Sequence, residues 1–495
     1  MSQASFPKSW VEIPLGEMNQ YQSQNSQPKD SPDETFELWS VPTFPTGKPE
    51  TVSGSEIGSS KQAVAPHDVL ICKINPRINR VWEVGEKDGY RQIASSEWIV
   101  VRQPLIEPRF FLRFFQSNQF RSKLCADVTG VGGSLTRAQP KKVATFSVTL
   151  PPTAEQKVIA DKLDTLLSQV ENTKARLERI PQILKRFRQS VLAAAVSGRL
   201  TEEWREAEAF ERVSITDIKQ SHRNYLIAKT KKYLEPIRFK KNNIAYQLPE
   251  TWEWFRAEEL CDLITKGTTP KKTDMSSDGN VPFIKVYNLT FDGILNFSIE
   301  PTYIPQHIHE TVLKRSKAYP GDVLMNIVGP PLGKVSVVPD TFPEWNLNQA
   351  ISIFRPVCGV IPNYLALCLR DTELLEKTKA KAKATAGQFN LTLEICRDYA
   401  VPVPPLKEQT EIVRRVDQLF VYADRIEQQV NQARARVNNL TQSILAKAFR
   451  GELTEQWRKD NPELISGENS AEALLERIKA ERVAKAPAKR RKHSA

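Results

Sequence analysis

Five histidines are the residues of this chain best suited to metal binding or acid–base catalysis, at positions 67, 222, 307, 309 and 493. Only His307 and His309 are close in sequence, and neither a cysteine nor a third histidine is near them. A structural zinc site needs four ligands, usually from clustered cysteines and histidines. We therefore interpret the pair as surface residues of an extended segment. We expect neither a metal site nor a Ser-His-Asp catalytic group.

Two other motifs that would indicate an enzyme are incomplete. The segment GPPLGKV (329–335) is one residue short of a phosphate-binding loop, contains prolines and has no Ser or Thr after its lysine. An adenine methylase needs Asp, Asn or Ser before a Pro-Pro pair and an aromatic residue after it. The Pro-Pro pairs here follow Leu150, Gly329 and Val403, and no aromatic residue follows them. We therefore predict no catalytic residues.

The charge balance favours an anionic partner. Lys and Arg total 70 against 58 Asp and Glu, a net charge of +12, and such a surplus favours nucleic acid. Gln and Asn can bond to adenine, and Arg and Lys to guanine or phosphate. For any single residue, a solvated loop charge is the favoured alternative. The candidate DNA-binding residues, from loops in both halves of the chain, are Lys73, Arg77, Arg80, Ser134, Arg137, Lys141, Lys142, Lys266, Thr268, Thr269, Lys271, Lys272, Gln388 and Asn390.

The chain contains an internal repeat. Residues 151–205 align without a gap on 404–458, with 18 identities in 55 positions. Each copy starts with Pro-Pro and Glu-Gln and ends with Gly-x-Leu-Thr-Glu-x-Trp-Arg. Weaker similarity lies upstream, where HDVLICKINPRINRV (67–81) matches GDVLMNIVGPPLGKV (321–335). The sequence is therefore a tandem duplication of one divergent and one well-matched segment.

The well-matched segments are predicted to form long helices. Their apolar residues recur in alternating steps of four and three, the seam of a coiled coil. A 40-residue helix of this kind is about 60 Å long. Two unpaired amphipathic surface helices are the alternative. The residues predicted to pair the helices are Ile159, Leu163, Leu166, Val170, Leu177, Leu184, Phe187, Val191, Ile412, Val416, Leu419, Ile426, Val430, Val437, Leu440 and Ile444.

The sequence gives weaker evidence for where the two helices begin and end and for the direction in which they pair. Pro-Pro suits a helix start, and Gly198 and Gly451 suit helix ends. Pro181 should kink the first helix. In an antiparallel pair the seams match when residue numbers add up to about 603, so that Ile180 faces Ala423. Periodicity alone does not exclude a parallel pair.

The divergent segments are predicted to be two mixed α/β domains, which makes the fold class α+β. Short apolar runs bounded by Gly, Pro, Asn and Asp predict strands. Strands are expected within 68–74, 97–104, 281–289, 322–328 and 350–356, helices at 108–117 and 362–378, and a loose loop at 19–62. The predicted organisation is a domain at 1–150, a helix at 151–199, a basic connector at 200–245, a domain at 246–403, a helix at 404–452 and a basic tail at 453–495. We expect the end of the tail, 475–495, to be solvated and frayed; contact with DNA phosphates is the alternative.

The sequence also suggests a location. The N-terminus has no apolar signal core, and no apolar run approaches about 18 residues, so we expect no membrane span. The six cysteines are scattered without a Cys-x-x-Cys pair, which fits a reducing compartment. We therefore expect a cytoplasmic protein.

These repeats resemble the specificity subunit of type I restriction–modification enzymes. The resemblance is strongest in the segments LPETWEWFRAEELCDLITKGTTP (248–270) and ATAGQFNLTLEICRDYAVPVPPLKEQTEIVRRVDQLF (384–420) and in the two Gly-x-Leu-Thr-Glu-x-Trp-Arg ends. The resemblance covers nearly the whole chain. The first half departs from it most, at SFPKSWVEIPLGEM (5–18) and at 130–137, which lacks the Gln-Phe-Asn of its counterpart.

The resemblance implies two target-recognition domains separated by two long helices that form an antiparallel coiled coil with a pseudo-twofold repeat. Each domain would read one half of a split double-stranded DNA target. The helices would fix the spacing and dock two methyltransferase subunits, which methylate adenine N6 with S-adenosylmethionine. Two motor–nuclease subunits that use ATP and Mg would complete the enzyme, and this chain would bind no cofactor itself. A free-standing DNA methyltransferase or nuclease with unrecognised motifs, and a coiled-coil scaffold that does not bind DNA, are the alternatives.

Overall fold

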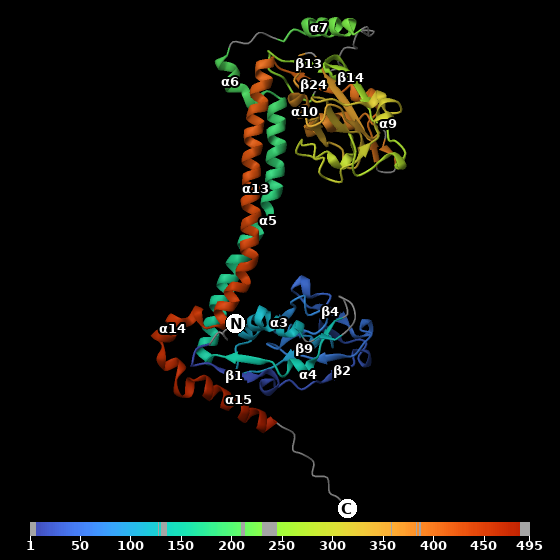
Figure 1. Cartoon of the computed structure of the whole chain (residues 1–495). Helices are drawn as coiled ribbons and strands as arrows, with labels where there is room; N and C mark the ends of the chain where they lie inside the picture. The colour runs from blue at the N-terminus through green and yellow to red at the C-terminus, as the bar shows by residue number, and fades with distance from the viewer. Residues whose placement is uncertain are drawn as a thin grey trace, which may run out of the picture. The chain divides into compact units, whose positions relative to one another are not determined.

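The computed structural model describes residues 6–126, 128–129, 136–208, 213–229, 245–357, 359–382, 384–385 and 388–485. The chain divides into two compact units: unit 1 comprises residues 1–178 and 431–495, and unit 2 comprises residues 179–430. The long helices α5 (Thr153–Val196) and α13 (Leu406–Phe449) each contribute a part to both units (Figure 1). None of the described helices has the length and apolar character needed to cross a membrane.

Domain 1, which we define as residues 6–150, precedes α5 in unit 1. Strand β1 (Val11–Pro14) pairs antiparallel with β12 (Ser147–Leu150), which ends shortly before α5 begins. Two larger sheets have the strand orders β7-β6-β9 and β2-β5-β8-β3-β4. Helices α2 (Pro108–Gln116) and α3 (Asn118–Ala126) supply five buried phenylalanines to the core. The sheet strands are β2 (Asn25–Ser26), β3 (Thr35–Trp39), β4 (Glu50–Ser53), β5 (Lys61–Ala63), β6 (Val69–Cys72), β7 (Val81–Glu83), β8 (Arg91–Ala94) and β9 (Trp98–Val101).

Domain 2, residues 245–403, precedes α13 in the same way. Strand β13 (Glu253–Arg256) pairs antiparallel with β24 (Ala400–Val403). The main sheet has the order β14-β21-β17-β19, and two three-stranded sheets have the orders β16-β15-β20 and β18-β23-β22. Their strands are β14 (Cys261–Lys266), β15 (Val281–Ile284), β16 (Tyr303–Ile304), β17 (Val323–Asn326), β18 (Val328–Gly329), β19 (Val335–Val337), β20 (Asn346–Leu347), β21 (Ile351–Pro356), β22 (Ala384–Thr385) and β23 (Gln388–Asn390).

The helix expected at 362–378 is two helices, α10 (Pro362–Arg370) and α11 (Thr372–Lys379). Asp371 separates them with extended backbone, and its carboxylate accepts a hydrogen bond from the backbone N–H of Leu374 at 2.9 Å. This is the usual N-cap of a new helix. The prediction of one continuous helix was therefore wrong, because apolar spacing alone did not reveal the cap.

The two domains share a buried ion pair although their sequences diverge. In domain 1 the Arg102 guanidinium donates two hydrogen bonds to Asp68, at 2.7 and 2.6 Å. In domain 2 Arg355 donates two to Asp322, both at 2.8 Å. Each aspartate comes directly before a central strand, β6 or β17, and each arginine follows or ends the neighbouring strand, β9 or β21. The weak upstream similarity therefore reflects one scaffold used twice.

The loose loop expected at 19–62 was wrong. Strands β2, β3, β4 and β5 all lie in this segment and form a sheet with β8. Phe36 is completely buried, and Leu38 and Trp39 are 7% and 4% exposed. The short apolar run FELW therefore forms a strand despite the surrounding Ser, Pro and Gly residues, because it pairs with β4 on one side and with the distant β8 on the other.

The long helices pair antiparallel in both units, as predicted. In unit 2, Arg188 of α5 contacts Asp424 and Glu427 of α13, and Leu200, which follows α5, accepts a hydrogen bond from Arg415. Residue numbers thus rise along one helix as they fall along the other. In unit 1, Lys162 Nζ donates to the Leu453 carbonyl at 2.9 Å. Pro181 lies inside α5, and the expected kink at this residue stays a prediction.

The expected register of the helices was wrong. It places Arg188 opposite residue 415, whereas Arg188 Nη2 lies 2.7 Å from Asp424 Oδ1. Nine residues of helix correspond to about 13 Å, which is further than an arginine side chain reaches. An apolar seam that repeats every heptad matches its partner in several registers, so the pattern could not select one.

A buried carboxylate joins the helices to each domain. In unit 2, Glu408 at the start of α13 accepts hydrogen bonds from Trp252 Nε1 (2.9 Å), Thr201 Oγ1 (2.7 Å) and Arg205 Nη1 (2.6 Å). In unit 1, Glu155 at the start of α5 accepts the same three bonds, and its donors are Trp10, Thr454 and Arg458. The Thr and Arg belong to the repeated Gly-x-Leu-Thr-Glu-x-Trp-Arg ends. Each end thus follows one long helix and anchors the start of the other.

The repeat extends further than the sequence revealed. After the repeated ends, α7 (Ile215–Ala228) packs on α8 (Ala257–Leu260), and α15 (Ala471–Lys485) packs on the corresponding α1 (Leu15–Met18). Ala471, Leu474 and Ile478 of α15 are buried in the unit 1 core. The expected solvated tail is therefore wrong for Ile478, which α15 buries, whereas most side chains of 479–484 are exposed. Residues 486–495 lie outside the described residues.

Candidate nucleic-acid interface

In domain 1, the predicted residues Lys73 and Arg137 lie together at the end of β6. The Lys73 backbone N–H donates to the Glu97 carbonyl at 3.0 Å, and the Lys73 carbonyl accepts from the Ala138 N–H at 2.8 Å. Arg137 is exposed and forms a 3.1 Å ion pair with the Glu97 carboxylate. Three segments distant in sequence therefore meet at one sheet end.

The other predicted residues of domain 1 are more dispersed. Arg80 Nη1 donates to the Ile74 carbonyl at 3.4 Å, and the carbonyl of exposed Arg77 accepts a hydrogen bond from Arg121. Lys141 and Lys142 are exposed on α4 (Pro140–Val143). Lys73 and residues of α4 line the same cavity, of about 390 Å³. Ser134 lies outside the described residues.

In domain 2, the predicted turn after β14 is held against the segment 347–351. The Gly267 N–H donates to the Ile351 carbonyl and the Thr268 N–H to the Leu347 carbonyl, both at 3.0 Å. A Cβ at Gly267 would lie only 2.1 Å from the Asn348 carbonyl oxygen, so the close approach requires glycine. Exposed side chains surround this turn: Lys266, Thr269, Lys271 and Lys272.

The second predicted segment of domain 2 joins the same sheet end. Exposed Asn390 pairs with Val328, and the next N–H, of Leu391, donates to the Ile327 carbonyl at 2.9 Å. The Ile327 N–H in turn donates to the Ala350 carbonyl at 2.8 Å. Gln388 lies in β23, but its side chain is outside the described part of the structure. The structure thus brings the two predicted loops of domain 2 to one place.

The two predicted sites occupy corresponding positions in the two domains. Lys73, Glu97 and Ala138 make the same two backbone hydrogen bonds as Ile327, Ala350 and Leu391. Arg137 in domain 1 therefore stands where Asn390 stands in domain 2, each directly before the pairing residue. One scaffold position carries a guanidinium in one domain and an amide in the other. These groups suit different base edges, guanine and adenine respectively.

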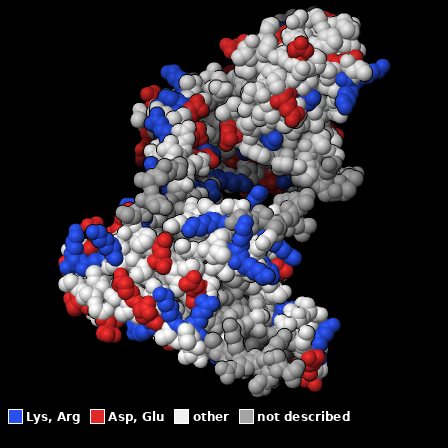
Figure 2. Space-filling model, turned by 60° about the horizontal axis from the view of Figure 1, so that its bottom comes forward, with Lys and Arg blue, Asp and Glu red and all other residues white. Residues whose placement is uncertain are grey.

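Sequence analysis missed one residue of this site. Gln349 is exposed, and its backbone N–H lies 3.5 Å from Thr269 Oγ1, so the residue lies beside the turn that carries the predicted lysines. No signal in the isolated sequence separates it from other surface amides, because its partner turn lies about 80 residues earlier. On the face shown in Figure 2, basic side chains form several groups with acidic ones between them. Charge on this face therefore does not identify the site without the loops.

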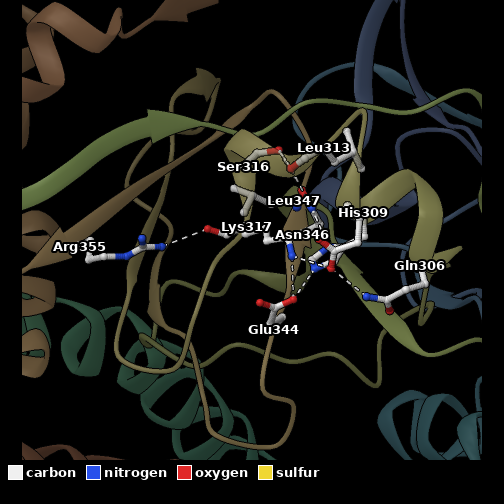
Figure 3. Close-up of polar contacts among 10 residues, drawn as sticks. Gln306, His309, Leu313, Ser316, Lys317, Glu344, Asn346, Leu347 and Arg355 are labelled. Carbon is white, nitrogen blue, oxygen red and sulfur yellow. Dashed lines mark hydrogen bonds and ion pairs between the residues drawn. The ribbon is translucent and has the colours of Figure 1, made fainter. Parts of the chain in front are cut away.

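The histidine pair differs from its interpretation as surface residues of an extended segment. The segment is helix α9 (Gln306–Glu310); His307 is exposed, but His309 is completely buried. His309 Nε2 lies 2.8 Å from Glu344 Oε2, and its Nδ1 lies 3.0 Å from Asn346 Nδ2 (Figure 3). The surface interpretation was wrong for His309, because its hydrogen-bond partners come from a segment 35 residues away.

His309, Glu310 and Glu344 bring three possible metal-ligand atoms within 4.8 Å of one another. The Lys317 ammonium lies 2.7 Å from the Glu310 carboxylate and 3.0 Å from the Glu344 carboxylate. Hydrogen bonds from His309 and Lys317 lower the pKa of Glu344. A cation would have to displace this lysine, so we interpret the cluster as a hydrogen-bonded brace of domain 2. The expectation of no metal site stays a prediction.

The predicted helix-pairing residues are mostly buried or half-buried. Ile159, Leu163, Val170, Leu184, Val191, Ile412, Val416 and Val430 are buried. The half-buried ones are Leu166, Leu177, Phe187, Leu419, Ile426, Val437 and Ile444. Leu440 is 46% exposed. At the domain ends the seam also packs on the domains, since Ile159 and Leu163 share a core with the phenylalanines of α2.

Two equivalent α/β domains and an antiparallel pair of long helices define an internally duplicated α+β protein. The family described as the type I restriction modification DNA specificity domain matches residues 7–182 and 249–433. The chain belongs to this family of type I restriction–modification specificity subunits. It is 34% identical to the EcoKI specificity subunit of Escherichia coli K12 over 98% of both chains. It is 44% identical to the EcoBI specificity subunit of Escherichia coli, over 68% of this chain and 64% of that one.

Solved structures show the same fold. A chain from a study of complex assembly and conformational transition of the type I R-M system has a TM-score of 0.65 and 20% identity, covering 90% of this chain and 99% of that chain. The HsdS subunit from Thermoanaerobacter tengcongensis has a TM-score of 0.57 and 22% identity, covering 90% and 98%.

Proposed function

We propose that this specificity subunit reads a two-part DNA target, with one half contacted by each domain. The observation that carries the proposal is the shared position of Arg137 and Asn390 on two equivalent scaffolds. The two equivalent scaffolds present different polar side chains at this position, so each domain would select a different base sequence. The surrounding lysines would bind phosphates and position the duplex.

The paired helices would fix the distance between the two half-sites and dock partner subunits. Each is 44 residues long, or about 66 Å, which exceeds one turn of B-DNA at about 34 Å. In unit 2 the pair exposes Ile183, Val421 and Tyr422, at 59%, 50% and 60%. Large apolar side chains exposed on a helix pair favour protein contact. We assign this surface to methyltransferase subunits.

The chemistry would belong to the partners. Two methyltransferase subunits would transfer a methyl group from S-adenosylmethionine to adenine N6, and two motor–nuclease subunits would use ATP and Mg for cleavage. The chain itself would be non-catalytic and bind no cofactor. The test is to incubate the chain with DNA and labelled S-adenosylmethionine, with and without its methyltransferase subunit. Label transfer only with the partner supports the proposal, and transfer by the chain alone would identify a free-standing methyltransferase.

Replacing Lys271 and Lys272 together with alanine should weaken DNA binding by the assembled methyltransferase. Each lysine that binds a phosphate displaces a counterion, so the slope of log affinity against log salt should fall by about 2. The loss should be similar for target and non-target DNA. Filter binding across a salt series measures both quantities. The control is Lys459→Ala in unit 1, whose lysine pairs with Glu455, and an unchanged slope in the double variant would remove these lysines from the interface.

Replacing Tyr422 with glutamate should weaken association with the methyltransferase subunit about 10- to 100-fold, because a charge would replace a large aromatic contact. The side chain is 60% exposed, so the free subunit should keep its unfolding midpoint. Analytical ultracentrifugation of the mixture measures the association. Gln428→Glu adds the same charge about 120° around the helix and serves as control. Equal affinity of both variants would place docking elsewhere.

A further inference from the structure

A cavity of about 480 Å³ lies in unit 2 between the C-terminal part of α5 and the region around α10 and α11. Leu192 of α5, Leu332 and Leu375 give it apolar walls. Phe291, at its lining, is 51% exposed, and nearby Ile294 is 63% exposed. The cavity is therefore open to solvent, and its apolar walls adjoin charged side chains, of which the basic ones, Lys185, Arg188, Arg370 and Lys379, outnumber the acidic Asp292 and Glu376.

Arg370, the last residue of α10, places an uncompensated charge in this cavity. Its Nη2 donates to the Phe291 carbonyl at 3.1 Å, and its guanidinium carbon lies 5.3 Å from the centre of the Phe420 ring. Its Nε is buried and has no hydrogen-bond partner among the described residues. A Cβ at Gly293 would lie 2.6 Å from Nη1, so this glycine packs closely against the guanidinium.

Nearby charges do not neutralise Arg370. No acidic side chain of the described residues forms an ion pair with it, although Asp292 and Asp417 act on it from a distance. Burial, together with the like charge of Arg188, lowers the pKa of Arg370 to about 10. Arg188 itself is bound by Asp424 and Glu427. A half-buried guanidinium without an ion-pair partner among the described residues carries a desolvation cost, which an anionic ligand would offset.

We propose that this cavity receives an acidic side chain, flanked by apolar ones, from the methyltransferase subunit that docks on the helix pair. The inference rests on the proposed function. One wall of the cavity is α5 itself, so an occupant would also contact one helix of the pair. The apolar walls favour a protein side chain over a DNA phosphate, which stays hydrated on a duplex. The Arg370 guanidinium, which lines the cavity, would donate to the incoming carboxylate.

The test compares assembly with stability in Arg370→Met, which keeps the side-chain volume and removes the charge. Association of the full chain with its methyltransferase subunit should weaken at least tenfold, whereas the unfolding midpoint of the free chain should stay equal or rise. A purely structural arginine would instead lower the midpoint when removed, and that result would overturn the inference. Arg370→Lys, which keeps the charge but not the paired donors, should retain part of the affinity.

The matched control is Arg355→Met in the same unit, where the arginine is fully paired with Asp322. That variant should lose stability. If the wild-type chain fails to assemble with the methyltransferase, the proposed function fails. If the wild type assembles and Arg370→Met assembles equally well, only the inference fails. If Arg370→Met assembles normally but the complex loses DNA affinity, the cavity binds phosphate and the protein occupant is excluded.

Discussion

Replacing Glu408 with alanine is expected to destabilise unit 2 by about 3–5 kcal/mol, because the substitution leaves the partly buried Arg205 guanidinium without its carboxylate. Glu408 is completely buried, and three donors converge on it at 2.6–2.9 Å. Removal of the carboxylate also leaves the indole N–H of Trp252 and the hydroxyl of Thr201 without their buried hydrogen-bond acceptor. The expected result is a large loss of stability of unit 2 from the removal of a single carboxylate.

Hydrogen exchange is the suitable measurement, since two units need not unfold in one step. Amides at the start of α13 should exchange faster in Glu408→Ala, while those of domain 1 should not change. Glu155→Ala should produce the converse pattern in unit 1. Glu455→Ala removes an exposed carboxylate paired with Lys459 and should leave exchange unchanged. Uniform acceleration across both units in either variant would contradict the assignment of one carboxylate to each unit.

Deleting one heptad from each long helix is expected to shorten the gap in the DNA target by about 3 base pairs. Seven residues span about 10 Å of helix, and B-DNA rises about 3.4 Å per base pair. Suitable segments are 171–177 and 434–440, which lie level in the register set by Arg188 and Asp424. A whole heptad preserves the phase of the seam, so the helices should still pair.

Mapping methylated adenines in cells that carry the variant and its methyltransferase subunit measures the gap directly. Both half-site sequences should stay the same, because neither domain is changed. Deleting 171–177 alone should abolish methylation, because α13 would then be seven residues longer than α5 and the two helices could no longer pair along their full length. An unchanged gap in the paired deletion would show that the helices do not set the spacing.

The helices, the repeat and the family could be predicted because their signals are local. Each heptad seam can be recognised within a single stretch of about 40 residues. The repeated Gly-x-Leu-Thr-Glu-x-Trp-Arg ends are identical at six of eight positions. Short apolar runs such as DVLMNIV likewise predicted strand β17. Each of these features depends on residues that are neighbours in the chain.

Tertiary structure decided which distant segments meet. The seam fits several registers, and contacts such as Arg188 with Asp424 select one. Burial of His309 depends on Glu344, and the equivalence of Arg137 with Asn390 appears only when three separate backbone segments pair. The conformational preferences of neighbouring residues do not determine which distant segments come into contact. The sequence pattern could therefore identify the loops of the site, but it could not predict where their side chains lie.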